Sequence, residues 1–109
     1  MIKAERYDVF FADLNPSIGS EIKKKRPVVV ISRNEMNGHL ETVVICPLTT
    51  QIHPRWRSRI QVYIDGKEAE IAVDQIRTIS RKRLIRKIDK IDKATALSLR
   101  LLISEMYGE

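Results

Sequence analysis

The chain has 109 residues, of which 43% are hydrophobic and 31% are charged. This length and composition are typical of one globular domain covering residues 1–109, and they exclude a disordered chain. The longest apolar runs, residues 28–31 and 43–46, are far shorter than the roughly 20 residues that cross a bilayer, so we expect no membrane protein. The net charge of +6 suggests a polyanionic partner, without distinguishing RNA, DNA and acidic protein.

The N-terminus and the cysteine content indicate the compartment. The first six residues are charged and contain no apolar segment of the signal-peptide kind. Cys46 is the only cysteine, which excludes an internal disulfide and a cysteine-cluster zinc site. We therefore expect a cytoplasmic protein.

Short β-branched runs separated by turn residues predict strands over the first two thirds of the chain. The predicted strands are residues 7–14, 26–32, 41–47, 59–64, 67–73 and 75–79. Asp65-Gly66 predicts a hairpin, since both positions tolerate a positive φ. In the strand after it, alternation places Ala69, Ile71 and Val73 on one side and Glu68 and Glu70 on the other.

The remaining segments predict turns and one helix. Residues 34–38 are typical of a turn, and residues 81–84 of one short helical turn. A helix begins after Asp92, which can cap it, and Ala94, Leu97, Leu101 and Ser104 fall on one of its faces. Short strands followed by one helix predict a small barrel or curled sheet closed by a terminal helix.

Four consecutive cations, residues 23–26, follow the loop that contains Gly19 and Ser20. We interpret Lys23, Lys24 and Lys25 as solvated. Arg26 differs, because Pro27 and an apolar strand follow it directly and hold its backbone at the strand end. A guanidinium held in this way offers a rigid fork that matches a phosphate group.

Thr49 and Thr50 follow the third strand. Threonines at a strand end usually form turn hydrogen bonds, and this is the more common role. The functional alternative is that a hydroxyl here lies beside the basic loop and donates to a phosphate oxygen.

The segment from Gln51 to Arg59 interleaves His53, Arg55, Trp56 and Arg57. Aromatic and cationic groups in alternation suit unpaired nucleobases, which stack on the ring while the cations meet the backbone. The alternative, equally weighted, is a tryptophan folded back over the barrel mouth. His53 could transfer protons at neutral pH, although loop histidines are more often bystanders.

The segment of residues 73–79 contains Asp74, Gln75 and Arg77 in an otherwise apolar stretch. The simplest role for Asp74 is an ion pair, with Arg77 as the nearest candidate partner. The basic residues that continue from Arg77 to Lys93 alternate with Leu84, Ile85, Ile88 and Ile91 and predict a solvated basic face.

Several catalytic signatures are missing from the sequence. It has no metal-ligand spacing of His, Cys and Asp residues, no glycine-rich phosphate loop opening a helix, and no G-x-S-x-G elbow. We therefore expect an enzyme, if the protein is one, to work without a metal or nucleotide cofactor.

Taken in order, the motifs resemble those of the MazF/PemK family of toxins. The matching segments are DVFFADLNP (8–16), GSE (19–21), RPVVVIS (26–32), PLTT (47–50), DQIRTI (74–79) and RL (83–84). Each motif alone is common, but the ordered set is specific and covers nearly the whole chain. The chain departs from the family at Tyr7, where glycine is usual. Some relatives have histidine at the position of Ser20 and arginine at that of Ala72.

The resemblance implies an SH3-like small β-barrel of the CcdB/PemK type with a C-terminal helix, assembled as a homodimer. It also implies a sequence-specific endoribonuclease of a type II toxin–antitoxin system, neutralised by a MazE-like antitoxin. Carried over by position, Arg26 and Thr49 are the residues most directly tied to cleavage. Glu21 matches an acid of the same loop, and Asp74 an acid that some members use.

The implied reaction is attack of the 2′-hydroxyl of single-stranded RNA on the adjacent phosphate, with no cofactor. Besides Glu21, Arg26 and Thr49, we predict RNA contacts for Ser20, Lys23, Lys24, Lys25, Thr50, Gln51, His53, Arg55, Trp56, Arg57, Asp74, Gln75 and Arg77. Two other classes remain open. They are a CcdB-like gyrase poison, which has a protein partner, and a nonenzymatic RNA-binding barrel.

Overall fold

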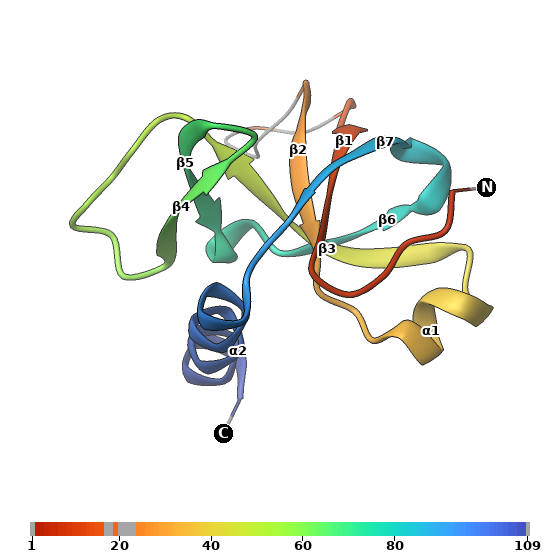
Figure 1. The fold of residues 1–109 in the computed structure, drawn as a ribbon. Helices are drawn as coiled ribbons and strands as arrows, with labels where there is room; N and C mark the ends of the chain where they lie inside the picture. The colour runs from red at the N-terminus through yellow and green to blue at the C-terminus, as the bar shows by residue number, and fades with distance from the viewer. Residues whose placement is uncertain (1, 17–18, 20–23, 109) are drawn as a thin grey trace.

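The computed structural model describes residues 2–16, 19 and 24–108 of the chain. Within these residues, seven strands pair in one curled antiparallel sheet (Figure 1). They are β1 (Asp8–Asp13), β2 (Lys25–Val30), β3 (Thr42–Thr49), β4 (Arg59–Ile64), β5 (Lys67–Ala72), β6 (Arg77–Ser80) and β7 (Leu84–Lys90). The sheet curls through half a barrel and α2 (Lys93–Tyr107) lies against it, which confirms the fold expected from the sequence.

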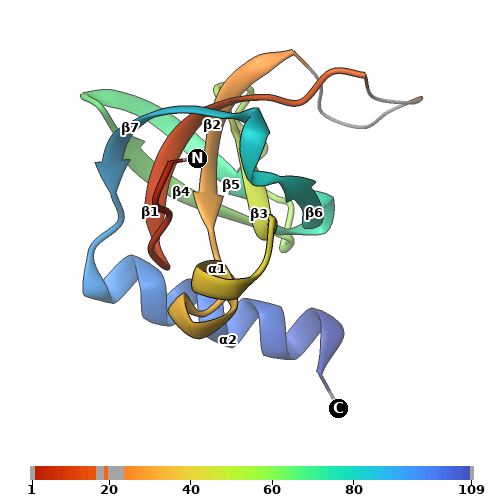
Figure 2. The same cartoon turned by 90° about the vertical axis from the view of Figure 1, so that its right-hand side faces the viewer.

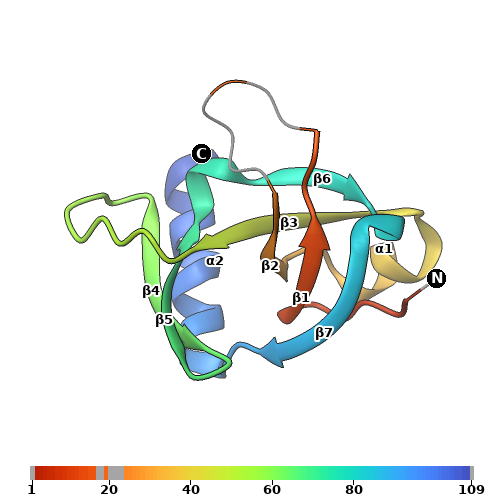
Figure 3. The same ribbon diagram turned by 90° about the horizontal axis from the view of Figure 1, so that it is seen from above.

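The strand β3 is central and joins the parts of the sheet (Figure 3). The strand order is β4-β5-β3-β2-β1-β7, with β6 paired to the N-terminal half of β3. On its other edge β3 pairs with β2, and its last two residues, Leu48 and Thr49, pair with Ile71 and Glu70 of β5. The C-terminal end of β3 therefore lies between the start of β2 and the end of β5.

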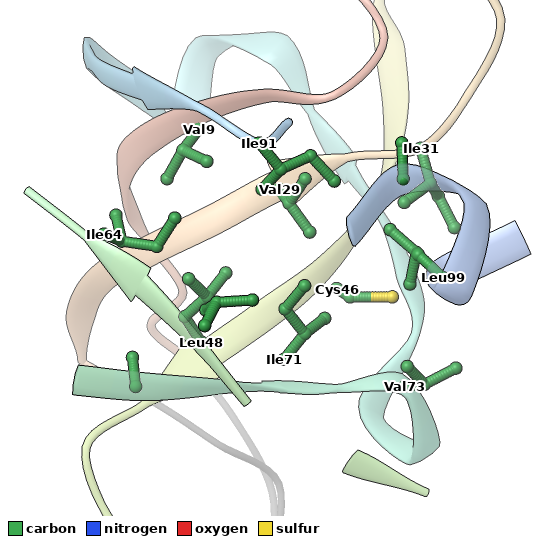
Figure 4. Close-up of a cluster of buried hydrophobic side chains, with 13 residues drawn as sticks. Val9, Val29, Ile31, Cys46, Leu48, Ile64, Ile71, Val73, Ile91 and Leu99 are labelled. Atoms are coloured by element: carbon green, nitrogen blue, oxygen red, sulfur yellow. The ribbon is translucent and has the colours of Figure 1, made fainter. Parts of the chain in front are cut away.

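The central strands are buried on both faces. Val28 and Val30 of β2 pack in one hydrophobic cluster with Phe10, while Val29 packs in the other with Val9. Figure 4 shows this second cluster, in which Val29 and Val9 meet Leu99 of the helix and Ile71 and Leu48 of the sheet. Burial on both faces explains why this segment is a continuous apolar run rather than an alternating one.

The C-terminal helix α2 packs along one side of the curled sheet (Figure 2). As predicted, Asp92 caps it, since its carboxylate Oδ1 accepts a hydrogen bond from the Thr95 amide at 2.7 Å. The predicted face was wrong. Ala96 and Leu99 are the buried helix residues, whereas Leu97 and Leu101 are exposed. Both faces carry apolar residues, so periodicity alone could not select the buried one.

Most predicted strands are confirmed, with shifts at their ends. The third strand continues to Thr49, two residues beyond its predicted end. The last short strand begins later than predicted, because a 3₁₀ turn, η1 (Val73–Gln75), precedes β6. Residues predicted as a turn form the short helix α1 (Asn34–His39).

The predicted helical turn near residue 81 is present as η2 (Arg81–Arg83), but the strand after it was missed. β7 pairs with β1, and its Lys87 and Lys90 place their Nζ atoms 3.1 and 3.3 Å from Oδ1 of Asp8. Because that carboxylate is buried, part of the basic face predicted to be solvated is used to hold β7 against β1.

Three non-glycine residues have a positive φ, among those described. Asp65 and Gly66, at 52° and 75°, form the predicted hairpin between β4 and β5. Tyr7, at 74°, occupies the position where glycine is usual in the resembled family. Its amide donates to the Val30 carbonyl at 2.6 Å, and its carbonyl accepts from the Ile91 amide, which offsets the strain of this conformation.

Candidate active site

Arg26 and Thr49 line one pocket at the end of the barrel. Arg26 is the second residue of β2, and Thr49 is the last residue of β3. The pocket has a volume of about 230 Å³. Its lining residues are Lys25, Arg26, Pro27, Leu48, Thr49, Thr50 and Ala69. Two groups that the sequence singled out separately thus open onto one space, which we call the phosphate pocket.

Arg26 is held at the wall of the phosphate pocket. The side chain is half-buried, and its Nη1 donates a long hydrogen bond of 3.4 Å to the Leu48 carbonyl. Burial lowers the pKa of the Arg26 guanidinium, which nevertheless stays protonated at neutral pH because arginine titrates so far above 7. The pocket therefore contains a fixed positive charge.

The Thr49 hydroxyl is nearly buried and has a defined orientation. Its Oγ1 accepts a hydrogen bond from the Gln51 amide at 3.2 Å, and the residue is only 8% exposed. Because the oxygen accepts from the backbone, the hydroxyl proton can be donated elsewhere. Thr50 beside it is exposed and lines the same pocket.

Part of the predicted site lies outside the described residues, namely Ser20, Glu21 and Lys23. Of the neighbouring lysines that the structure describes, Lys24 and Lys25 are exposed, and Lys25 lines the phosphate pocket beside Arg26. The predicted roles of these five residues stay predictions.

A buried carboxylate, Glu70, holds the loop between β3 and β4. Glu70 is fully buried on β5. Its Oε2 accepts from the His53 amide at 2.9 Å, and its Oε1 lies 3.1 Å from His53 Nδ1 and 2.8 Å from Arg59 Nη1. The loop of residues 50–58 projects at one side of the molecule (Figures 1 and 3), and Glu70 fastens its middle to the sheet.

The Trp56 ring stacks on another side chain of the same loop. It lies 3.8 Å from the His53 ring, with 14° between the planes, and the Arg59 guanidinium lies 4.6 Å from the Trp56 ring centre. Trp56 is still 49% exposed. The neighbouring Arg55 and Arg57 are exposed, and Gln51 is exposed at the start of the loop.

Asp74 forms its ion pair with Arg59. Arg59 Nε donates to Oδ1 at 2.7 Å and Nη2 to Oδ2 at 3.4 Å. We expected Arg77 as the partner. The 3₁₀ turn η1 instead brings Asp74 beside the first residue of β4, since Arg59 pairs with Ala72 in the sheet. Gln75 and Arg77, both half-buried, follow in η1 and β6.

Arg59 therefore joins two carboxylates into one network. Burial disfavours the charged form of Glu70, but the hydrogen bonds from His53 and Arg59 outweigh it, so the pKa of Glu70 lies below its ordinary value. For Asp74, burial again opposes ionisation, and the hydrogen bonds from Arg59 and Ser58 outweigh it, so the pKa of Asp74 is lowered as well. Both acids are ionised at neutral pH.

The sequence did not reveal that Glu70 is buried. Alternation placed it only on the side of the strand opposite Ile71. The covering loop is what buries it. The available signal was the Asp65-Gly66 hairpin, which fixes the register Gln61 to Glu70 and thereby places Arg59 diagonally across from the acid.

The described residues contain no cluster of three or more His, Cys, Asp or Glu side chains that could hold a metal ion. None of the helices in the described part of the chain is long and apolar enough to cross a membrane.

A family model described as "PemK-like, MazF-like toxin of type II toxin-antitoxin system" matches residues 5–107. The chain belongs to the PemK/MazF family. It is 38% identical to Endoribonuclease EndoA of Bacillus subtilis (strain 168), over 90% of this chain and 96% of the relative. The PemK/MazF resemblance is thus confirmed, and with it the predicted class of endoribonuclease toxin.

Solved structures of PemK/MazF toxins share the fold. MazF from Deinococcus radiodurans superposes with a TM-score of 0.87 at 17% identity, with both chains fully covered. An endoribonuclease from a mycobacterial species, solved in complex with its cognate antitoxin, gives a TM-score of 0.79 at 21% identity, covering 99% of this chain and 96% of the other.

Proposed function

We propose that this PemK/MazF toxin cleaves single-stranded RNA in the phosphate pocket. The observation that carries the proposal is the placement of Arg26 and Thr49 on one small pocket, with a fixed guanidinium on one wall and an oriented hydroxyl on another. A guanidinium and a hydroxyl donor together match the non-bridging oxygens of a phosphodiester.

The reaction uses the substrate's own nucleophile. The 2′-oxygen of the ribose forms a bond to the adjacent phosphorus as its proton leaves, and the bond to the 5′-oxygen breaks as that oxygen takes up a proton. The products are a 2′,3′-cyclic phosphate and a 5′-hydroxyl fragment. No metal ion or nucleotide cofactor takes part in this scheme.

Arg26 stabilises the extra negative charge that develops on the pentavalent phosphorus, and Thr49 donates to one phosphate oxygen and holds it in line. Donors aimed in advance at developing charge are worth about 3–4 kcal/mol each in other enzymes. We propose Glu21 as a further catalytic residue because it matches the family's acid in this loop, and we assign the general acid and the general base to no residue.

RNA has to be single-stranded to enter, because a duplex hides its base edges and restrains the in-line geometry. The strand would follow the basic end of the β1–β2 loop and the 50–58 loop. The residues proposed to contact it are Ser20, Lys23, Lys24, Lys25, Thr50, Gln51, His53, Arg55, Trp56, Arg57, Asp74, Gln75 and Arg77.

The proposed partners follow from the family and from the charge. We propose a homodimer that is neutralised by a MazE-like antitoxin, whose acidic, disordered segment folds on the basic toxin and covers the RNA groove. Cleavage of mRNA inhibits translation and growth, so the protein would act in the cytoplasm.

One incubation distinguishes this function from its two rivals. Purified protein is mixed with a long RNA in excess EDTA, and the products are separated on denaturing and native gels. Fragments ending in a 2′,3′-cyclic phosphate support the nuclease. Intact RNA with a shifted native band supports a nonenzymatic RNA-binding barrel, and unshifted intact RNA supports a CcdB-like gyrase poison.

A further inference from the structure

A second cavity adjoins the phosphate pocket. It has a volume of about 240 Å³ and shares Pro27, Leu48, Thr50 and Ala69 with that pocket, so the two lie wall to wall. Its walls are mostly apolar. The apolar wall residues are Phe11, Pro27, Leu48, Ile64, Ala69 and Ile88. An apolar cavity directly beside a charged one offers a single ligand two chemically different subsites.

The walls of this cavity are fixed by the sheet. It lies where β7 faces the hairpin of β4 and β5, two parts that are not neighbours in the strand order. The Asp65 amide at the hairpin tip donates to Asp89 Oδ2 of β7 at 2.9 Å. This hydrogen bond fastens the hairpin to β7 beside Ile64 and Ile88, so the cavity is formed before a ligand arrives.

Polar groups stand at the rim. Lys67 and Arg86 are exposed cations, and Asp65 contributes a carboxylate. The Arg86 guanidinium lies 5.4 Å from the centre of the Phe11 ring, which gives the rim a planar cation above an aromatic wall. Cations at the mouth of an apolar cavity suit a ligand that carries both a flat apolar group and phosphates.

We propose that this cavity is a base pocket, which holds the nucleobase of a nucleotide next to the scissile phosphate. The inference rests on the proposed function and deepens it. The ribose joins a base to its phosphate over a short span, and the two cavities are neighbours that share four lining residues. Stacking against apolar walls supplies affinity, Asp65 accepts from ring or exocyclic N–H groups, and Lys67 and Arg86 meet the flanking phosphate.

The occupant is a nucleobase rather than an apolar side chain of a protein partner. The lining residues shared with the phosphate pocket and the two rim cations favour a ligand that carries phosphate on both sides of its flat group. A base pocket at this place would set the preference for one nucleotide beside the cut.

The test compares a substitution that fills the cavity with a matched control substitution on the same strand. Ile88→Phe fills the base pocket, whereas Ile85→Phe adds the same bulk at an exposed position of β7 outside both cavities. We expect Ile88→Phe to raise KM for RNA about tenfold and to relax the sequence preference at one nucleotide beside the cut. Ile85→Phe keeps the wild-type KM and cut sites. Thermal melts establish that both variants fold.

A direct binding measurement on the unaltered protein removes the dependence on a variant. DNA dinucleotides lack the 2′-hydroxyl and cannot be cut. They should shift the methyl NMR signals of Ile64 and Ile88, whereas an abasic sugar-phosphate of the same length should not.

Each result has a distinct meaning. Wild-type protein that leaves RNA intact overturns the proposed nuclease, and the methyl shifts then still decide the base pocket. If the wild-type protein cuts RNA and a folded Ile88→Phe variant has the same KM and the same cut sites, the base pocket is overturned and the nuclease is not. Weaker antitoxin binding by Ile88→Phe with unchanged RNA cleavage assigns the cavity to a protein side chain and also overturns it.

Discussion

Arg26 and Thr49 line one pocket just beyond the paired part of the β2–β3 ladder. The ladder ends with the pair Val28 and Pro47, and Arg26 and Thr49 each lie two residues beyond it. Arg26 Nη1 reaches the carbonyl of Leu48, the residue directly before Thr49. The sheet register, rather than a loop conformation, therefore brings the guanidinium and the hydroxyl to one pocket, which is the kind of rigid support a preorganised site requires.

The Thr49 hydroxyl can be tested without changing the shape of the pocket. Thr49→Val removes the donor and keeps the branched side chain, and we expect cleavage of RNA to slow roughly a hundredfold. Thr49→Ser keeps the hydroxyl and most of the rate. Thr42→Val, an exposed threonine on the same strand, serves as the control and leaves the rate unchanged. Single-turnover kinetics make the comparison, and an active Thr49→Val enzyme would remove Thr49 from the mechanism.

Trp56 is held by His53 and Arg59 and is 49% exposed, and we propose that its exposed side stacks on RNA. We expect Trp56→Ala to weaken the affinity for an uncleavable RNA by about tenfold, since stacking of a base on an aromatic ring is worth about 1–3 kcal/mol. Tyr63→Ala removes an aromatic side chain of β4 that is more exposed than Trp56, at 77% against 49%, and serves as the control. Fluorescence anisotropy measures both. Equal affinities for the wild type and Trp56→Ala would assign the ring to packing of the loop.

Glu70 should contribute strongly to stability. Glu70→Ala removes the acceptor of the His53 amide and leaves Arg59 with Asp74 as its ion-pair partner. Removing one partner from a buried ion pair costs about 3 kcal/mol of stability. Glu68→Ala changes an exposed acid on the same strand and should change the free energy of unfolding by less than about 0.5 kcal/mol. Urea unfolding distinguishes them, and similar midpoints for the two variants would show that the buried network contributes little.

The same network sets a pH dependence. The pKa of Glu70 and that of Asp74 are both lowered in the folded protein, from ordinary values of 4.5 and 3.8. The unfolded chain therefore binds protons at a higher pH than the folded chain does. The stabilisation is fully present above pH 5 and is lost as the pH falls through and below 4. We expect the free energy of unfolding of Glu70→Gln to decline less steeply over this range than that of the wild type, and parallel declines would contradict the assignment.

The sequence predicted the sheet well where one signal dominated. Asp65-Gly66 specified the hairpin, and the β-branched run at residues 28–31 specified a strand, which the structure buries on both faces. The helix was predicted with its cap but with the wrong face, because Leu97 and Leu101 on the exposed side are as apolar as the side that packs. β7 was missed because its lysines and arginines concealed the strand pattern, and its partner Asp8 lies at the other end of the chain.

The sequence indicated which residues form the candidate site, but it did not indicate which of them contact one another. Arg26 and Thr49 stood out as single residues at strand ends, but their common pocket depends on the β2–β3 register. Likewise, the sequence shows Asp74 and nearby arginines, yet the 3₁₀ turn decides that Arg59 is its partner. The base pocket could not be predicted at all, since it is formed by residues of six strands and of the β4–β5 turn.

The rate at which Arg26→Ala cuts RNA in EDTA shows whether this guanidinium takes part in cleavage. We expect a folded variant, with a wild-type melting curve, whose single-turnover rate on a long RNA falls about a hundredfold or more. Arg26→Lys keeps the charge without the planar fork and should recover only part of the rate, while Arg33→Ala, an exposed arginine remote from the phosphate pocket, should cut like the wild type. A folded Arg26→Ala protein that cuts RNA at the wild-type rate would contradict the account.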